Sequence, residues 1–148
     1  MEFIICIPAR YESSRLPGKP LLKINGKTII NHVYEKALEL KKKYKIFDLV
    51  VLTDSELVKK EVDDFGGIAI IIHELCLNGT DRIIHYLQNY YIANTISLKN
   101  KVVINIQGDE PFINIKNISK AIDNYINKKE DENIVCSTIH HMTRDVDT

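Results

Sequence analysis

The scarcest cationic side chain of this 148-residue sequence is concentrated near its start. The chain has sixteen lysines but only four arginines, and two of these, Arg10 and Arg15, precede Lys19 within the segment 8–20. A guanidinium is a planar fork that matches phosphate oxygens, and an ammonium adds a compact point charge. The segment therefore predicts a loop that binds an anion such as a triphosphate. The alternative is a solvated turn whose charges bind nothing.

The other residues of segment 8–20 also suit a phosphate-binding loop. Ser13 and Ser14 add hydroxyl groups, three prolines stiffen the chain, and Gly18 is expected to let backbone N–H groups approach the ligand. The sequence contains neither the Walker A pattern nor the G-x-G-x-x-G pattern. These absences argue against a P-loop nucleotide hydrolase and against a dinucleotide-binding protein.

A short acidic segment, 107–111, follows a predicted strand. Asp109 comes after the strand and a glycine, so its carboxylate is expected to project into the same crevice as the cationic loop. A Mg²⁺ ion takes one or two carboxylates together with phosphate oxygens, which makes Asp109 the candidate metal ligand. Glu110 is less suited, because neighbouring side chains do not easily point the same way. The alternative is an Asp-Glu-Pro surface turn.

Two further segments leave alternatives open. Arg82 lies at the start of a predicted helix, where a cation opposes the helix macrodipole, so another contact is expected to hold it there. The alternative is an exposed arginine that pairs with Asp81. The pair Thr53-Asp54 follows a predicted strand, and we interpret it as a helix N-cap.

Short aliphatic runs alternate with amphipathic stretches along the chain. Strands are predicted at 3–7, 49–52, 68–72, 102–106 and 134–139, and helices with one apolar face at 29–40, 57–65, 83–91 and 115–126. The apolar faces include Leu57 and Ile84; Thr80 or Asp81 is the expected N-cap of the third helix, and Gly66-Gly67 is expected to end the second. This alternation predicts an α/β fold with a parallel sheet and helices on both faces. Ligands of such sheets bind beyond the carboxyl ends of the strands, where the cationic and acidic segments both lie.

Composition excludes several classes of protein. Twenty basic and twenty acidic residues give a net charge of zero, which argues against partners such as nucleic acid or a membrane surface. The longest aliphatic run, 68–72, is far too short to span a bilayer, and the first residues lack the basic region of a signal peptide, so a cytoplasmic protein is expected. The three cysteines and five histidines, including His140-His141, show no metal-ligand spacing.

Four sequence blocks, in order over the first 111 residues, carry a family resemblance. They are Ile7–Tyr11 with Ser13–Leu21, Ile24–Lys27, Asn78–Arg82 and Val103–Pro111. Together they resemble the 3-deoxy-manno-octulosonate (Kdo) cytidylyltransferase, or CMP-Kdo synthetase, family. In the third block Asn-Gly-Thr-Asp-Arg stands where the family has Ser-Gly-Thr-Glu-Arg. Sialic-acid cytidylyltransferases share the fold, but their first loop reads differently.

The resemblance implies a three-layer α/β/α, Rossmann-like nucleotide-diphospho-sugar transferase fold. It implies an enzyme in which the anomeric hydroxyl of Kdo attacks the α-phosphate of CTP, giving CMP-Kdo and pyrophosphate for lipopolysaccharide-type glycan synthesis. The catalytic groups would be Arg10, Arg15 and Lys19, which would bind the triphosphate with the help of Ser13 and Ser14.

The resemblance also assigns the rest of the site. The cytidine pocket would be formed by Ala9, Gly79, Thr80 and Arg82. Gln107 would contact the nucleotide or the sugar, and Asp109 would hold Mg²⁺. Nothing in the sequence matches Asp145 or Asp147 to the second metal ligand of the family.

Family members continue well beyond residue 148, so we expect residues 1–148 to be one nucleotidyltransferase domain that lacks its C-terminal part. The absent part would carry the second metal ligand, most sugar-binding residues and much of a homodimer interface. Two alternatives follow: a CTP-binding fragment or remnant without catalysis, and a cytidylyltransferase for another acid sugar such as sialic acid.

Overall fold

The computed structural model describes residues 1–13 and 15–128. Ser14, Cys136, the strand predicted at 134–139, His140-His141, Asp145 and Asp147 lie outside the described residues. The chain divides into two compact units, Met1–Ile113 and Asn114–Thr148, and each is described by itself.

The first unit contains a four-stranded parallel sheet. Its strands are β1 (Glu2–Ala9), β4 (Ile46–Thr53), β5 (Ala69–Ile71) and β6 (Lys101–Asn105), in the order β5-β4-β1-β6. The four strands predicted in this part of the sequence are confirmed. Strand β1 is central and is buried from Phe3 to Ala9, as expected of an uninterrupted apolar run. The strand order reverses beside β1, so the loops after β1 and β6 flank the point where such sheets bind ligands.

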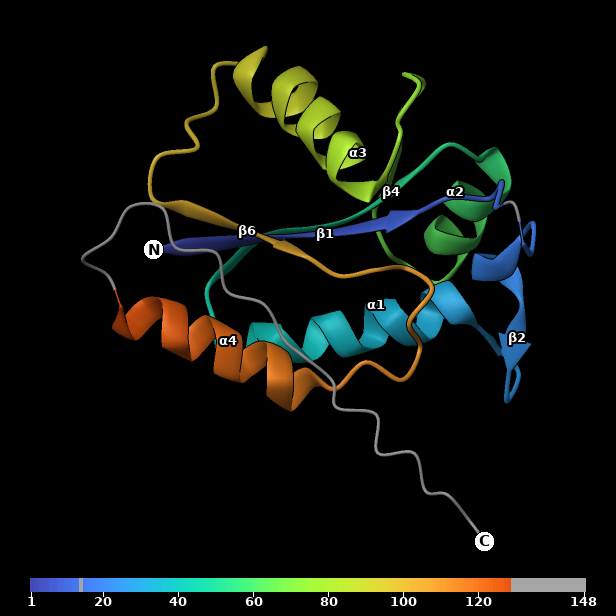
Figure 1. The fold of residues 1–148 in the computed structure, drawn as a ribbon, viewed down its shortest axis with the longest axis horizontal. Helices are drawn as coiled ribbons and strands as arrows, with labels where there is room; N and C mark the ends of the chain where they lie inside the picture. The colour runs from blue at the N-terminus through green and yellow to red at the C-terminus, as the bar shows by residue number, and fades with distance from the viewer. Residues whose placement is uncertain (14, 129–148) are drawn as a thin grey trace, which may run out of the picture. The chain divides into compact units, whose positions relative to one another are not determined.

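Helices cover both faces of this sheet, which confirms the three-layer α/β/α architecture (Figure 1). Helix α1 (Ile29–Glu39) lies on one face and α3 (Gly79–Tyr86) on the other. Helix α2 (Glu56–Asp64) lies beside α1, where the Tyr34 and Phe65 rings pack with their centroids 5.4 Å apart. On the α3 face, Ile4 and Cys6 of β1 form a buried core with residues of β4, α3 and the segment that follows it.

Shorter elements connect these layers. An Asn25-Gly26 turn with positive φ at both residues joins the hairpin strands β2 (Lys23–Ile24) and β3 (Lys27–Thr28). Two 3₁₀ turns, η1 (Lys19–Leu21) and η2 (Leu40–Lys42), follow the first loop and α1. The π-helical segment η3 (Leu87–Ile92) continues α3.

The structure corrects two helix starts. Ser55, rather than Thr53 or Asp54, caps α2: its hydroxyl accepts the N–H of Leu57 at 3.2 Å. Asn78, rather than Thr80 or Asp81, caps α3 by accepting the N–H of Asp81 at 2.9 Å. Each cap is the last residue with extended backbone before the helix, which is the geometry that an N-cap requires.

The apolar faces were predicted less well than the elements. Leu57 and Ile84 were expected in the core, but they are 57% and 45% exposed. Helix α3 instead buries Tyr86 and Arg82. The predicted glycine stop of α2 is confirmed, since Gly66 has φ +81° and Gly67 donates to the carbonyl of Val62 at 2.8 Å.

The second unit is described only through α4 (Ile115–Asn127). Asn114 caps this helix, and Ile118 and Ile122 are buried, in agreement with the predicted apolar stripe. Among the helices that the structure describes, none has the length and apolar character needed to cross a bilayer.

The amino-terminal edge of the sheet carries a closed cluster of charges. The Glu2 carboxylate accepts from Lys45 at 2.6 Å and from Lys101 at 2.8 Å, and the Lys101 ammonium lies 3.8 Å from the centre of the Phe47 ring. These two lysines lower the pKa of Glu2 to about 2. Each charge in this cluster therefore has a partner.

Candidate active site

A cleft of about 560 Å³ lies at the carboxyl end of the sheet. The loops after β1 and β6 and the start of α3 form its walls. The predicted site residues that line it are Ala9, Arg10, Ser13, Arg15, Lys19, Gly79, Thr80, Gln107 and Asp109. The structure therefore brings together nine of the predicted residues from three separate segments.

The cationic loop and the acidic segment meet inside this cleft. The Lys19 ammonium lies 3.0 Å from the Asp109 carboxylate, across 90 residues of sequence. Both side chains are partly exposed, so this ion pair contributes little to stability and either partner can exchange for a ligand. The predicted shared crevice is confirmed by this contact.

Backbone pairing beyond the end of β6 places Asp109. The N–H of Ile106 donates to the carbonyl of Cys6, and the N–H of Gly108 donates to that of Pro8, each at 3.0 Å. A Cβ atom at Gly108 would lie 2.8 Å from the Pro8 carbonyl oxygen and from the Ala9 Cβ. Only glycine fits this approach, and it brings the next residue, Asp109, beside the loop after β1.

Gly18 shapes the base of the cationic loop. Its N–H donates to the Tyr11 carbonyl at 2.7 Å, and its φ of +71° turns the chain into η1. Tyr11 and Gly18 thus close the base of the loop, and Lys19 follows immediately. Ser13, whose hydroxyl accepts the N–H of Leu16 at 3.2 Å, also supports the turn.

The remaining wall of the cleft comes from α3 and the residue after Ile106. A Cβ at Gly79 would lie 3.1 Å from the Pro8 side chain, so this glycine lets the first turn of α3 approach the end of β1. Thr80 is exposed at the cleft. The Gln107 amide donates to the Asn105 side chain at 3.1 Å, which orients it along the wall.

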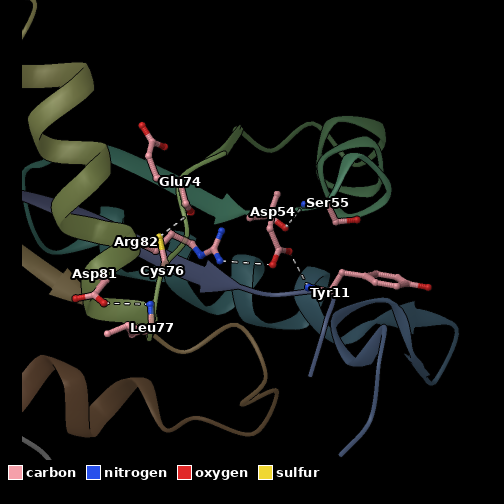
Figure 2. Close-up of polar contacts among 9 residues, drawn as sticks. Tyr11, Asp54, Ser55, Glu74, Cys76, Leu77, Asp81 and Arg82 are labelled. Atoms are coloured by element: carbon pink, nitrogen blue, oxygen red, sulfur yellow. Dashed lines mark hydrogen bonds and ion pairs between the residues drawn. The ribbon is translucent and has the colours of Figure 1, made fainter. Parts of the chain in front are cut away.

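Arg82 is buried and does not pair with Asp81. Its side chain is only 3% exposed, so it is neither part of the cleft lining nor an exposed partner of Asp81. Asp81 instead accepts the N–H of Leu77 at 3.1 Å, while the Arg82 guanidinium points to Asp54 (Figure 2). The macrodipole argument correctly required another contact, and Asp54 supplies it.

Sequence reasoning missed Asp54. One of its carboxylate oxygens accepts the N–H of Tyr11 at 3.0 Å, and the other lies 3.5 Å from Arg82 (Figure 2). The available signal was its position directly after a buried parallel strand, the same signal that singled out Asp109. That signal was assigned to helix capping.

The cleft is electropositive. Three cations and one carboxylate line it, and Arg10 and Arg15 have no ion-pair partner among the described residues. Within residues 1–13 and 15–128, no group of three or more histidine, cysteine or acidic side chains is arranged to hold a metal ion. Asp109 is the carboxylate that lines the cleft, and magnesium sites in proteins take one or two carboxylates together with phosphate oxygens and water.

Comparison with known proteins agrees with this geometry. Residues 4–147 match the family model described as Cytidylyltransferase. The chain belongs to the cytidylyltransferase family. A 3-deoxy-manno-octulosonate cytidylyltransferase of Idiomarina loihiensis is 40% identical over 130 residues, which are 88% of this chain and 48% of that protein. An 8-amino-3,8-dideoxy-manno-octulosonate cytidylyltransferase of Shewanella sp. strain ANA-3 is 43% identical over 82% of this chain and 46% of its own length.

Solved structures show the same relationship. A CMP:2-keto-3-deoxy-manno-octonic acid synthetase complexed with CTP superposes with a TM-score of 0.75 at 37% identity, over 88% of this chain and 49% of that one. A cytidylyltransferase from Leptospira borgpetersenii gives a TM-score of 0.63 at 26% identity, over 88% of this chain and 51% of its own. The chain thus spans about half the length of the relatives and structures it matches.

Proposed function

We propose that this chain binds CTP in its cleft and forms the nucleotide-binding part of a cytoplasmic enzyme that activates Kdo for lipopolysaccharide-type glycans. The reaction would convert CTP and Kdo into CMP-Kdo and pyrophosphate. The observation that carries the proposal is the contact between Lys19 and Asp109, because it joins the loop that would bind the triphosphate to the carboxylate that would hold Mg²⁺. The relatives named for Kdo and its 8-amino analogue support the substrate class.

The side chains of the cleft suit a triphosphate. Arg10, Arg15 and Lys19 would neutralise its oxygens, and the Ser13 and Ser14 hydroxyls would donate to them. Lys19 would exchange its present partner, Asp109, for a phosphate oxygen. Because that ion pair is exposed and isolated, breaking it costs little free energy.

The carboxylate released in this exchange becomes free to bind a cation. When bound, Mg²⁺ would neutralise charge on the triphosphate and on the pyrophosphate leaving group. Asp109 would hold it from the protein side, and the Gly108 backbone would keep that carboxylate at the rim.

The transfer step needs alignment more than covalent chemistry. The anomeric hydroxyl oxygen of the sugar would attack the α-phosphorus and release its proton to water, while the bond from the α-phosphorus to the oxygen that bridges it to the β-phosphorus breaks and pyrophosphate leaves. Arg15 and Lys19 would stabilise the charge that develops on the leaving group. Ala9, Gly79 and Thr80 would hold the cytidine, and Gln107 would contact the nucleotide or the sugar.

The acceptor is the least constrained part of the proposal. Kdo and its 8-amino analogue are both represented among the relatives by name. A panel containing these two sugars and sialic acid, with pyrophosphate release as the readout, separates the three acceptors. Sedimentation of the same preparation tests the expected homodimer.

Pyrophosphate release from CTP, Mg²⁺ and Kdo tests the function itself. Lys19→Ala and Asp109→Ala should abolish the release, whereas Lys45→Ala, at the opposite edge of the sheet, should leave it unchanged. Binding of CTP by calorimetry without any turnover would restrict the chain to the CTP-binding role. Release that is indifferent to both cleft substitutions would refute the assignment of the site.

A further inference from the structure

Arg82 is a buried cation with very few partners. It is 2% exposed, its Nε and Nη1 atoms have no hydrogen-bond partner within the described part of the chain, and only Nη2 approaches a carboxylate, at 3.5 Å. Desolvating a guanidinium costs more than one long ion pair returns. The side chain is therefore poorly explained as a stabiliser of the core.

The carboxylate that Arg82 approaches controls the base of the cationic loop. Asp54 accepts the N–H of Tyr11 at 3.0 Å through its other oxygen. The backbone carbonyl of the same residue, Tyr11, accepts the N–H of Gly18 at 2.7 Å. Arg10 precedes this closed base and Lys19 follows it, so Asp54 contacts the loop between the two cations.

Arg82 is a rigid anchor for this carboxylate because α3 is fixed to the sheet. Tyr86, one turn further along α3, donates its hydroxyl to Asp48 of β4 at 2.5 Å and is 1% exposed. Tyr91 in η3 donates to the same carboxylate oxygen at 2.8 Å. Figure 2 shows the resulting line from α3 through the guanidinium and Asp54 to the Tyr11 backbone.

We infer that Arg82 and Asp54 form a positioning pair that holds the loop between Arg10 and Lys19 in place for anion binding. Arg82 acts on the loop through Asp54. The consequence for CTP rests on the proposed function, whereas the consequence for the loop does not.

Limited digestion with trypsin measures the loop without any ligand. Cleavage after Arg10 and after Arg15 reports how often the loop opens, and Lys19 is protected by the proline that follows it. In Arg82→Met, an apolar side chain replaces the buried cation, so the melting temperature should stay the same or rise. Cleavage at the two arginines should nevertheless become about tenfold faster, as expected for loss of one charge-assisted contact.

Two Asp54 variants test whether Arg82 acts on the loop through Asp54 or only stabilises the fold. Asp54→Asn keeps an acceptor for Tyr11 but loses the charge that pairs with Arg82, so it should match Arg82→Met. Asp54→Ala loses both contacts and should be cleaved fastest. The double variant Arg82→Met with Asp54→Asn should be no worse than either single change, because both remove the same interaction.

Lys101→Met is the matched control, since Lys101 is also a largely buried cation paired with a carboxylate, but at the amino end of the sheet. It should leave loop cleavage unchanged. CTP titration adds a second readout: the dissociation constant should rise about tenfold in Arg82→Met and not in Lys101→Met.

The outcomes are distinguishable. Faster loop cleavage in Arg82→Met without CTP binding by the wild type refutes the proposed function and supports the positioning pair. Unchanged cleavage in Arg82→Met and Asp54→Asn, or a lowered melting temperature with no selective change at the loop, overturns the pair. Additive effects in the double variant also overturn it.

Discussion

The two ends of strand β1 carry opposite arrangements of charge. At the amino end, one carboxylate, Glu2, is held between two lysines, one of which lies over an aromatic ring. At the carboxyl end, Asp109 faces three cations across an open cleft, and within residues 1–13 and 15–128 its ion pair is with Lys19 alone. At the amino end every charge of the cluster has a partner, whereas at the carboxyl end the cations outnumber the carboxylate.

This difference separates structure from function. Side chains that neutralise one another tie neighbouring strands together but have no capacity left for a ligand. Arg10 and Arg15, which have no ion-pair partner among the described residues, retain that capacity. The comparison predicts that substitutions at the cleft change ligand binding, whereas substitutions at the amino end change stability and its dependence on pH.

Removal of a cleft cation should have the largest effect. Lys19→Ala should weaken CTP binding by about 10- to 100-fold, because a charge-assisted hydrogen bond to phosphate is lost. Lys45→Ala at the amino end should leave the CTP dissociation constant unchanged. Titration calorimetry of the two variants in the same buffer decides this; equal losses in both would remove the distinction between the two ends.

Asp109→Asn should have opposite effects on CTP binding in the absence and in the presence of Mg²⁺. Without the ion, loss of a carboxylate that repels the triphosphate and occupies Lys19 should tighten CTP binding. With the ion, loss of the protein ligand should weaken binding about tenfold. Two titrations, with and without Mg²⁺, test this reversal. Weakening in both conditions would mean that Asp109 serves the loop rather than a metal.

Gly108→Ala should damage both the fold and the cleft. The new Cβ would stand 2.8 Å from the Pro8 carbonyl oxygen and the Ala9 Cβ, so the segment that carries Asp109 must move away. We expect the free energy of unfolding to fall by about 1–3 kcal/mol. Urea denaturation measures this, and CTP titration of the folded fraction reports the displaced carboxylate. An unchanged unfolding midpoint would refute the close approach.

Glu2→Gln should have the smallest effect and none on CTP. The pKa of Glu2 is lowered to about 2 in the folded chain, below its ordinary value of 4.5, so its ionised form stabilises the fold above pH 4.5. That contribution disappears as the pH falls from 4.5 to 2. The difference in urea midpoint between wild type and Glu2→Gln should therefore shrink over this interval. A difference that is constant with pH would contradict the closed cluster.

The sequence was sufficient to predict most strands and helices and the meeting of the cationic and acidic segments. Apolar runs and stripes define strands and helices locally, and parallel strands bring their carboxyl ends to one edge, so Lys19 and Asp109 were expected to meet. Boundaries and faces were harder. Asn78, Thr80 and Asp81 are all competent caps, and only the backbone conformation selects Asn78.

The burial of Arg82 and its contact with Asp54 could not be predicted from the sequence. A cation near a helix start is equally compatible with solvent, a ligand or a buried partner. The choice depends on Asp54, which is 28 residues away and reaches Arg82 only because β4 ends beside α3. The hydrogen bond from the Gly18 N–H to Tyr11 was unpredictable for a similar reason, because it depends on how the loop closes.

The central claim is that two segments far apart in sequence bind one polyphosphate. Titration of the isotope-labelled chain with CTP and Mg²⁺, followed by amide NMR, tests it most directly. We expect the largest shifts in three stretches, 9–19, 78–80 and 107–109, saturating together at a single dissociation constant. Shifts confined to one stretch, or gathered around Glu2 and Lys101, would contradict the claim.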